Sequence, residues 1–268
     1  MKTLILGNGF VGKPLYESIS SGEETSNSYT AIWGKRLNEL TNLDTADYDV
    51  IINTAAKTSI DWCEANKAET FDTNVIQAVR IAKLLTPTQK YVFFSSACIF
   101  KSEYPYDINY EDAIPNPQCF YTYTKLMAEQ LIYEARPDSL IIRPRLLISE
   151  KSHPRNTINK LLKYPQIIDT QESATILEDL ITKIKELISY DEKGAFNIFN
   201  EGTISPSRIA EIFDHPHTQI TKRALDELTK GQARRVSTVL GTKRTLPLPN
   251  IEARLLEIRK TWDMSQNG

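Results

Sequence analysis

The sequence is poor in the residues on which disulfide frameworks and metal sites depend. Its 268 residues include only three cysteines, Cys63, Cys98 and Cys119, and three histidines. An odd, sparse set of cysteines in a chain that opens without a signal-peptide pattern predicts reduced thiols and a cytoplasmic location. The histidines lie at positions 153, 215 and 217, a spacing that matches no common metal site. We therefore expect neither disulfides nor a bound metal.

Two other absences limit the partners. No apolar run approaches the length of a membrane-spanning helix, so we expect no membrane insertion. The 32 lysines and arginines do not outnumber the 34 aspartates and glutamates, and the net charge of −2 gives no reason to expect nucleic-acid binding. The remaining composition is that of an ordinary globular protein, with 41% hydrophobic residues. Residues 22–27 are predicted to form a solvated loop.

The order of the apolar segments predicts an α/β fold with a doubly wound parallel sheet. Short β-rich runs fall at residues 3–6, 30–33, 50–53, 91–95, 140–142 and 195–199. Helix-period segments fall at residues 65–84, 156–163, 174–189, 206–213 and 250–262. Strands that alternate with helices indicate a parallel sheet covered on both faces.

A glycine-rich turn follows the first predicted strand. It consists of Gly7, Asn8, Gly9, Phe10, Val11 and Gly12, and a helix begins after it. Glycines allow a tight turn and a close approach of the backbone to a pyrophosphate, and the helix N-terminus offers free N–H groups to that anion. This context predicts a Rossmann-type dinucleotide site, with a ligand-free glycine turn as the alternative.

The end of the second predicted strand indicates which dinucleotide is bound. A carboxylate at this place hydrogen-bonds a ribose hydroxyl in NAD-binding proteins, but this chain has Gly34, Lys35 and Arg36. A guanidinium fits a phosphate dianion in a forked geometry. We therefore predict NADPH, with Arg36 on the 2′-phosphate and NADH as the alternative cofactor. The competing interpretation is a pair of solvated cations on a loop.

A tyrosine and a lysine four residues apart form the third motif. Tyr121 and Lys125 open a predicted helix and share one face of it. An ammonium near a phenol is expected to lower the phenol pKa and to make it a useful acid–base group. Ser96, at the end of an upstream strand, can donate a hydrogen bond to a developing oxyanion. Together these residues predict the reduction of a carbonyl, in which Lys125 also holds the nicotinamide ribose.

These motifs resemble those of extended short-chain dehydrogenases/reductases. The likeness is greatest to the 3,5-epimerase/4-reductase of nucleotide-rhamnose synthesis, which is also the C-terminal half of plant UDP-rhamnose synthase, and dTDP-4-dehydrorhamnose reductase is related. The matching stretches are IDWCEANKAETFDTNV, ACIF, FYTYTK, PRNTINKLLKYPQII, TILEDL and AFNIFNEGTIS. They lie within residues 2–205. The family's glycine at position 97 is replaced by Ala97, and the last sixty or so residues match only loosely.

The resemblance implies further roles. Cys98 and Lys160 match the acid–base pair that serves epimerisation at carbons 3 and 5 of the sugar. Cys98 is two residues beyond Ser96, so a continuing strand would place both side chains on one side. The competing interpretations are a buried core thiol for Cys98 and a solvated lysine for Lys160. The remaining implied cofactor contacts are Asn53, Ala55, Ala56 and Asn74.

A nucleotide-linked keto-sugar is the expected substrate, and an upstream 4,6-dehydratase would supply it. A homodimer is a candidate assembly. The expected substrate-binding residues are Arg155, Asn156, Thr175, Arg234 and Arg235, each with a surface or capping role as the alternative. The predicted division places residues 1–149 and 170–200 in the NADP-binding domain and residues 150–169 and 201–268 in a smaller substrate lobe.

Three functions stay open from the sequence. The first is a bifunctional 3,5-epimerase/4-keto-reductase that makes a nucleotide-L-rhamnose. The second is a simple 4-keto-sugar reductase, and Cys98 and Lys160 are the residues that separate it from the first. The third is a non-catalytic NADP-binding regulatory subunit on the same fold. The intact set of Ser96, Tyr121 and Lys125 argues against this third function.

Overall fold

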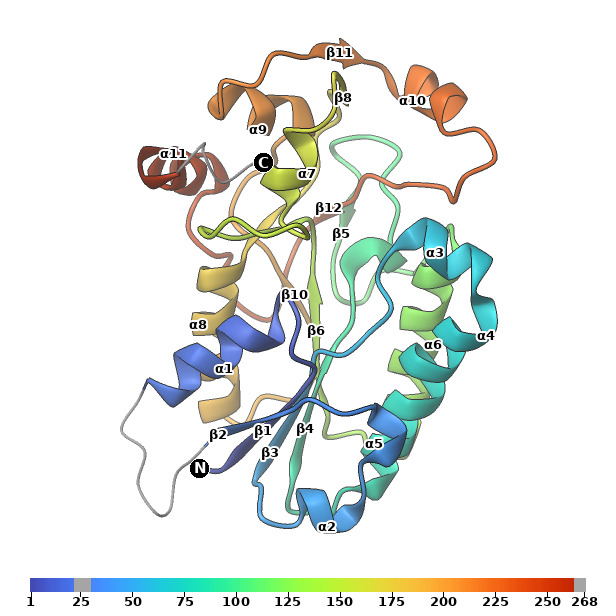
Figure 1. Ribbon diagram of the computed structural model, residues 1–268, viewed down its shortest axis with the longest axis vertical. Helices are drawn as coiled ribbons and strands as arrows, with labels where there is room; N and C mark the ends of the chain where they lie inside the picture. Colours follow the sequence, from blue (N-terminus) through green and yellow to red (C-terminus); the bar gives the residue numbers. More distant parts are fainter. Residues whose placement is uncertain (22–29, 263–268) are drawn as a thin grey trace.

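A six-stranded parallel sheet is the centre of the molecule (Figure 1). The computed structural model describes residues 1–21 and 30–262. The strand order is β10-β6-β4-β3-β1-β2, and every pairing in it is parallel. The strands are β1 (Thr3–Leu6), β2 (Thr30–Trp33), β3 (Val50–Asn53), β4 (Lys90–Phe94), β6 (Leu140–Pro144) and β10 (Gly194–Ile198). The predicted α/β fold with a doubly wound parallel sheet is therefore confirmed.

The strand order reverses beside β1. From β1 the chain moves to β2 on one side, and it then crosses to β3 on the other side of β1. In open α/β sheets, ligands bind in the crevice at the carboxyl ends of the strands where the order reverses. The glycine-rich turn after β1 lies at this place.

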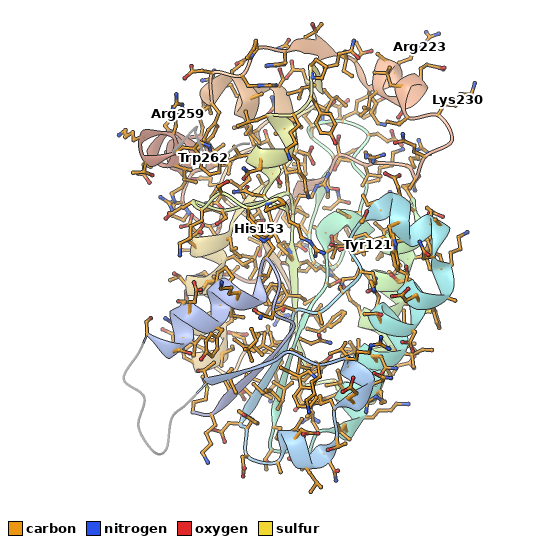
Figure 2. All side chains as sticks on the ribbon, in the orientation of Figure 1. Tyr121, His153, Arg223, Lys230, Arg259 and Trp262 are labelled. Atoms are coloured by element: carbon orange, nitrogen blue, oxygen red, sulfur yellow. The ribbon has the colours of Figure 1, made fainter. Side chains whose placement is uncertain are left out.

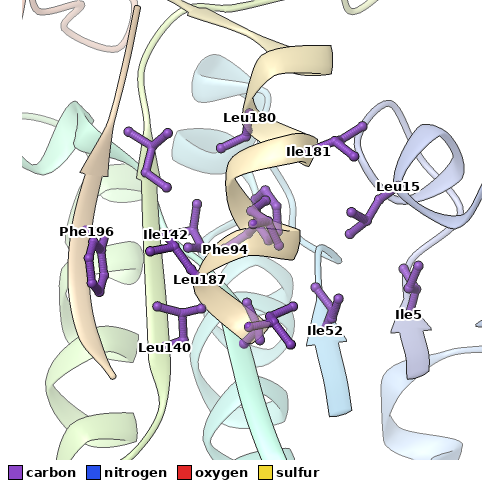
Figure 3. Close-up of a cluster of buried hydrophobic side chains, with 14 of the residues drawn as sticks. Ile5, Leu15, Ile52, Phe94, Leu140, Ile142, Leu180, Ile181, Leu187 and Phe196 are labelled. Atoms are coloured by element: carbon purple, nitrogen blue, oxygen red, sulfur yellow. The ribbon is translucent and has the colours of Figure 1, made fainter. Parts of the chain in front are cut away.

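Helices cover both faces of the sheet (Figures 1 and 3). One face packs against α1 (Gly12–Ser20) and α8 (Leu177–Ser189), and Leu15 and Leu180 from these helices lie in the same buried cluster as Ile5 and Ile142 of the sheet. The opposite face packs against α5 (Gln77–Leu84) and α6 (Phe120–Ala135). Burial of each such side chain contributes roughly 1.5–3 kcal/mol relative to exposure.

A second group of elements lies beyond the carboxyl ends of the strands (Figure 1). It contains α7 (Thr157–Leu161), β8 (Gln166–Ile168), α9 (Pro206–Ile212), β11 (Thr218–Ile220), α10 (Lys222–Leu228) and α11 (Ile251–Thr261). Strand β8 pairs with β11, and a separate apolar cluster includes Phe213 and Trp262, whose rings meet edge to face at 5.3 Å. Figure 2 labels Trp262 beside α11. These elements form a lobe with its own core.

Two short helices, η1 (Leu37–Glu39) and α2 (Asn42–Thr45), connect β2 to β3. The other short elements are η3 (Ala97–Ile99), β5 (Ile108–Asn109), β7 (Leu147–Ile148), β9 (Thr175–Ile176) and β12 (Val239–Leu240). Strand β10 belongs to the main sheet, as expected. The helix expected from residue 174 begins only at Leu177, because the two residues before it pair with β7 as β9. The two-domain division itself stays a prediction.

The helix expected over residues 65–84 is a continuous helical run from Lys67 to Leu84, which consists of α4 (Lys67–Phe71), the π-helical turn η2 (Asp72–Ile76) and α5. A separate helix, α3 (Ile60–Ala65), precedes it. Asn66 leaves helical geometry, with φ −126° and ψ 58°. The buried Asn74 side chain lies in the π turn and bonds to the backbone of Lys57. An apolar period does not reveal such interruptions, because the buried face continues through them.

Residues 22–27, expected to be a solvated loop, lie outside the described residues. Within the described parts of the chain, none of the helices has both the length and the apolar character needed to span a bilayer.

Candidate active site

The glycine-rich turn is built so that two of its glycines cannot be replaced without a shift of the backbone. Gly7 has φ +103°, and a Cβ there would lie 3.0 Å from the Ala55 backbone nitrogen. A Cβ on Gly12 would lie 1.8 Å from the Gly7 carbonyl oxygen. A Cβ on Gly9 would meet nothing within 4 Å. The turn is thus closed toward the end of β3 and open at Gly9, where a pyrophosphate can come close to the protein backbone.

The start of α1 is suited to an anion. Val11 is the N-cap residue, and no side chain caps this helix within the described part of the chain. Among the first N–H groups, that of Lys13 donates to the Gly9 carbonyl at 3.1 Å, and the positive end of the helix dipole remains available to a phosphate. Asn8 and Gly9 are exposed and Phe10 is half-buried. These residues fit the pyrophosphate of a dinucleotide.

Two buried asparagines brace the loop that faces the glycine turn. The Asn53 amide donates to the Tyr91 hydroxyl at 2.9 Å, and its oxygen accepts from the Ala55 backbone N–H at 3.1 Å. The Asn74 amide binds the Lys57 backbone at both ends and also donates to Thr124 at 3.1 Å. Their side chains set the position of Ala55 and Ala56 beside the turn. Direct contact of these residues with a cofactor stays a prediction.

Tyr121, Lys125 and Ser96 come from α6 and from the end of β4. Helix α6 begins at Phe120, whose N–H donates to the Glu64 carboxylate at 2.6 Å. One turn beyond Tyr121, the buried Lys125 ammonium donates to the Phe94 carbonyl at 2.5 Å. The Ser96 hydroxyl lies close enough to the Tyr121 phenol to influence its pKa. The three predicted residues are therefore together at the carboxyl edge of the sheet.

The electrostatics of the pair differ from the expectation that the phenol pKa is lowered. Burial raises the pKa of Tyr121 above its ordinary value, and the Ser96 hydroxyl opposes this only in part. Burial also lowers the pKa of Lys125 to about 8, although the charge of Glu129 opposes it. The expected lowering was wrong because desolvation dominates the shift, and the Lys125 ammonium bonds to the Phe94 carbonyl instead. Tyr121 is therefore a neutral phenol at neutral pH, which is the form that can donate a proton.

Cys98 lies on a helical turn and not on a continuing strand. Strand β4 ends at Phe94, and Ser96 caps η3 by accepting a hydrogen bond from the Cys98 N–H at 3.2 Å. The expected strand alternation between Ser96 and Cys98 was therefore wrong, although both remain beside Tyr121. The half-buried Cys98 sulfur accepts a hydrogen bond from Arg145 Nη1 at 2.8 Å. The sequence analysis did not identify Arg145.

Lys160 and His153 belong to the lobe side of this region. Lys160 is exposed on α7, and partial desolvation together with the charge of Arg155 lowers its pKa. The His153 ring stacks on Phe10 of the glycine turn, with centroids 4.9 Å apart. Desolvation, Arg155 and Lys160 lower the pKa of His153. Figure 2 shows His153 and Tyr121 at a similar height beyond the sheet. No spacing in the sequence indicated His153.

Two of the predicted substrate residues have another role in the structure. Thr175 is fully buried, and its hydroxyl accepts from the Arg145 N–H at 3.0 Å and donates to the Ile198 carbonyl at 2.9 Å. Asn156 is fully buried as the N-cap of α7, and its amide donates to the Ser149 carbonyl at 2.8 Å. Both side chains are occupied by these hydrogen bonds, which would have to break before either side chain could contact a substrate.

The predicted arginines lie on the surface. Arg36 is exposed after β2, and Arg155 is exposed before α7. Arg234 is exposed and donates to Gln118 at 3.2 Å, whereas Arg235 pairs with Asp61 at 2.6 Å. Asp61 also accepts from the Ala233 N–H at 3.1 Å. Thus Asp61 and Glu64 of the DWCE stretch hold the tail and the start of α6, two roles that the sequence alone did not reveal.

The fold and this site define a class of protein: a Rossmann-type dinucleotide-binding protein with a serine–tyrosine–lysine set at the sheet edge. The family model described as the RmlD substrate binding domain matches residues 1–223. The chain belongs to that family.

Named relatives agree with this membership, and solved structures share the fold. The chain is 30% identical over 165 residues to a bifunctional dTDP-4-dehydrorhamnose 3,5-epimerase/dTDP-4-dehydrorhamnose reductase of Arabidopsis thaliana, a match that covers 58% of this chain and 54% of the relative. The UDP-rhamnose synthase of Acanthamoeba polyphaga mimivirus has a similar structure, with a TM-score of 0.86, 20% identity and coverage of 98% and 99% of the two chains. A dTDP-4-dehydrorhamnose reductase of Bacillus anthracis in complex with NADP has a TM-score of 0.81, 20% identity and coverage of 97% and 99%.

The match to the plant relatives is partial. It spans about half the length of the bifunctional relative, and 24% of a trifunctional UDP-glucose 4,6-dehydratase/UDP-4-keto-6-deoxy-D-glucose 3,5-epimerase/UDP-4-keto-L-rhamnose-reductase of Arabidopsis thaliana. Solved structures at 20% identity establish the shared fold.

Proposed function

We propose that this chain is an NADPH-dependent reductase of a nucleotide-linked 4-keto-6-deoxy sugar, which first epimerises the sugar at carbons 3 and 5 and so forms a nucleotide-L-rhamnose. The observation that carries the reductase proposal is the position of Ser96, Tyr121 and Lys125 at the carboxyl edge, beside a glycine turn that is open at Gly9. The names of the relatives in the same family support the substrate class.

NADPH supplies a hydride when it is bound, and the residues of the chain prepare the ketone to accept it. Tyr121 holds a proton at its phenol oxygen and donates it to the carbonyl oxygen of the sugar. Ser96 accepts from the Cys98 N–H, which leaves its own hydroxyl hydrogen to donate to the same oxygen or to Tyr121. Lys125 is anchored to the Phe94 carbonyl and binds the nicotinamide ribose. The arrangement supplies general acid catalysis and oxyanion support.

The epimerase part rests on Cys98 and Lys160. A ketone at carbon 4 acidifies the protons on carbons 3 and 5 through an enolate, so one group must remove a proton and another must return one on the opposite face. Cys98 lies beside Ser96 and Tyr121, and Lys160 lies on the lobe with a lowered pKa. A simple 4-keto-sugar reductase is the second candidate, because in that enzyme these two groups would have no chemical role.

The decisive experiment supplies UDP-, dTDP- and GDP-4-keto-6-deoxyglucose with NADPH in deuterated water and identifies the product sugar. The proposal expects deuterium in the sugar even without NADPH, and a rhamnose configuration after reduction. Cys98→Ser should lose the exchange and still reduce a pre-epimerised ketone. Reduction with no deuterium and with retained configuration at both carbons would leave the simple reductase. Oxidation of NADPH by none of the three substrates would contradict both candidates.

The cofactor preference has its own test. Arg36→Ala removes the guanidinium proposed to bind the 2′-phosphate, so it should weaken NADPH binding by about 1–3 kcal/mol while NADH binding changes little. Lys83→Ala on α5 is the control for the loss of an exposed cation away from the glycine turn. Equal losses for NADPH and NADH in Arg36→Ala would contradict the assignment.

A further inference from the structure

Arg145 forms a buried charged cluster with Cys98 and Glu172 that the proposed reaction does not yet use. Its guanidinium donates to the Cys98 sulfur through Nη1 at 2.8 Å, and to the Glu172 carboxylate and the Val236 carbonyl through Nη2. The Arg145 and Glu172 side chains are only 10% and 7% exposed. The ion pair is therefore buried, and the same guanidinium contacts a thiol beside Ser96 and Tyr121.

We propose that Arg145 is a positioning residue that holds the Cys98 sulfur as a thiolate beside Ser96 and Tyr121. The Glu172 carboxylate, which binds the same guanidinium, weakens this stabilisation of the thiolate. The inference rests on the proposed function in one respect: the proton that the thiolate removes is one on carbon 3 or 5 of the sugar. The ionisation of Cys98 can be measured without any sugar.

The direction of the hydrogen bond supports the thiolate. A guanidinium has five N–H donors and no acceptor, so the sulfur must be the acceptor in this contact. A thiolate is the better acceptor, and a neighbouring arginine is one of the features that activate cysteines in proteins. Burial acts to lower the pKa of Arg145, but the Glu172 carboxylate and the hydrogen bonds to Glu172 and Cys98 raise it, so the guanidinium keeps its charge.

The position of Arg145 is fixed from several sides. Its backbone N–H donates to Thr175, which in turn donates to the Ile198 carbonyl at the end of β10. Its side chain reaches Glu172 before β9 and Val236 in the tail. The guanidinium is therefore oriented before a substrate arrives, which is the condition for a preorganised charge in a site.

Other titratable groups also face the sulfur. Tyr121 and Cys119 lie close enough to interact electrostatically with Cys98, and both have raised pKa values because burial dominates. They are neutral at neutral pH and do not compete for Arg145. Glu172 does compete, because its carboxylate bonds to the same guanidinium. Removal of the Glu172 charge should therefore increase the thiolate fraction, whereas removal of Arg145 should decrease it.

The thiolate has a definite chemical task in the proposed epimerisation. Cys98 as thiolate takes the proton from carbon 3 or 5, and the electron pair of the broken C–H bond moves into the enolate. The Lys160 ammonium then gives a proton to the opposite face of that carbon, which leaves Cys98 as a thiol and Lys160 as an amine. Exchange of one proton with water restores both groups. A neutral thiol at Cys98 would be a much poorer base for the first step.

The test is the pH dependence of Cys98 alkylation by iodoacetamide in the full chain, followed by mass spectrometry of the peptide that contains Cys98. Arg145→Met should slow alkylation near neutral pH by about tenfold, the factor that corresponds to one pH unit in the titration midpoint. Arg145→Lys, which keeps the charge, should recover part of the rate. Glu172→Gln, which keeps the shape, should react faster than the wild type. NADPH binding and thermal unfolding report whether each variant is folded.

Opposite effects of Arg145→Met and Glu172→Gln support the inference, because a merely structural cluster would respond in the same direction to both changes. Two results found together would overturn it. Wild type and Glu172→Gln would have equal alkylation profiles, and Arg145→Lys would react no faster than Arg145→Met. Failure of the proposed function is a separate result: the alkylation effects would persist, but no deuterium would enter the sugar. Deuterium exchange with an alkylation rate independent of Arg145 would leave the function and remove this inference.

Discussion

At the scale of single residues, burial controls the protonation of the proposed acid–base groups. Tyr121 is 8% exposed and Lys125 is 2% exposed, and desolvation is the largest cause of both pKa shifts. The phenol is kept protonated and the ammonium is made easier to deprotonate. The structure therefore favours Tyr121 as a proton donor to the oxygen formed during reduction, and Lys125 as a group whose position is fixed by the Phe94 carbonyl.

Replacement of Tyr121 by phenylalanine should remove most of the reductase activity. Loss of a general acid typically costs ~10²–10⁴-fold in rate. The measurement is NADPH oxidation with a 4-keto-6-deoxy sugar nucleotide. Tyr123→Phe is the matched control, because Tyr123 lies on the same helix and is 54% exposed. Near-normal turnover in Tyr121→Phe would show that another group donates the proton.

The buried lysine should make the stability of the free protein depend on pH. The Lys125 pKa is about 8 in the fold against 10.5 as its ordinary value, so between these values the unfolded chain binds the extra proton and the folded protein does not. Stability therefore rises with pH through this window, and the cost of the buried charge is fully present below it.

The measurement compares urea unfolding of wild type and Lys125→Met near pH 7 and near pH 9.5. The wild type should gain about 2 kcal/mol relative to the variant between the two conditions. Lys83→Met, an exposed lysine on α5, is the control and should follow the wild type. A constant difference between wild type and Lys125→Met across the two conditions would contradict the lowered pKa.

At the scale of elements, most of the functional groups lie where an element begins or ends. The glycine turn lies between β1 and α1, Ser96 follows β4, and Tyr121 is in the first turn of α6. Helix ends expose backbone N–H groups and the carboxyl ends of parallel strands meet at one edge, so this edge gathers polar groups that the sheet interior cannot hold. The Glu64 carboxylate further fixes the start of α6 through the Phe120 N–H.

Two glycines of the turn should respond differently to alanine. Gly12→Ala would place a Cβ 1.8 Å from the Gly7 carbonyl oxygen, so it should destabilise the protein by about 1–3 kcal/mol and distort the turn. Gly9→Ala has open space around its Cβ, so it should leave stability within about 0.5 kcal/mol and weaken NADPH binding. Thermal unfolding and NADPH titration measure the two effects. Unchanged NADPH affinity in Gly9→Ala would indicate that the pyrophosphate does not approach this residue.

At the scale of the whole molecule, the tail returns across the sheet edge and is tied to it. Val236 accepts from Arg145, Ala233 and Arg235 bond to Asp61, and β12 pairs with β5. Segments from distant parts of the chain thereby surround Cys98 and Tyr121. A site between a dinucleotide-binding sheet and such a lobe can bind both a cofactor and a second, larger ligand.

The ties to Asp61 should control access to the tail. Asp61→Ala removes the acceptor for the Ala233 N–H and the partner of Arg235, so trypsin should cleave within residues 229–237 roughly threefold to tenfold faster. Mass spectrometry of the fragments identifies the cut. Asp226→Ala is the control, because Asp226 pairs with Lys222 inside α10 and does not link the tail to the sheet domain. Equal cleavage rates in Asp61→Ala and wild type would mean that other contacts hold this segment.

The sequence by itself determined the parallel sheet, the glycine turn and the Ser96, Tyr121 and Lys125 set. These features depend on short-range patterns: runs of β-branched residues, a glycine spacing, and two residues four apart on a helix. The strand runs at residues 3–6, 30–33 and 50–53 have the same bounds in the structure. Local backbone preferences and apolar periodicity fix such elements before any long-range contact forms.

Only the tertiary structure decided the surroundings and the protonation of these residues. Arg145 lies 47 positions from Cys98 and 27 from Glu172, so no local pattern can reveal that the three meet. The raised pKa of Tyr121, the buried hydroxyl of Thr175 and the stacking of His153 on Phe10 likewise depend on what packs around each group. Desolvation and long-range contacts are properties of the assembled chain, because they arise only when segments distant in sequence exclude water from one another.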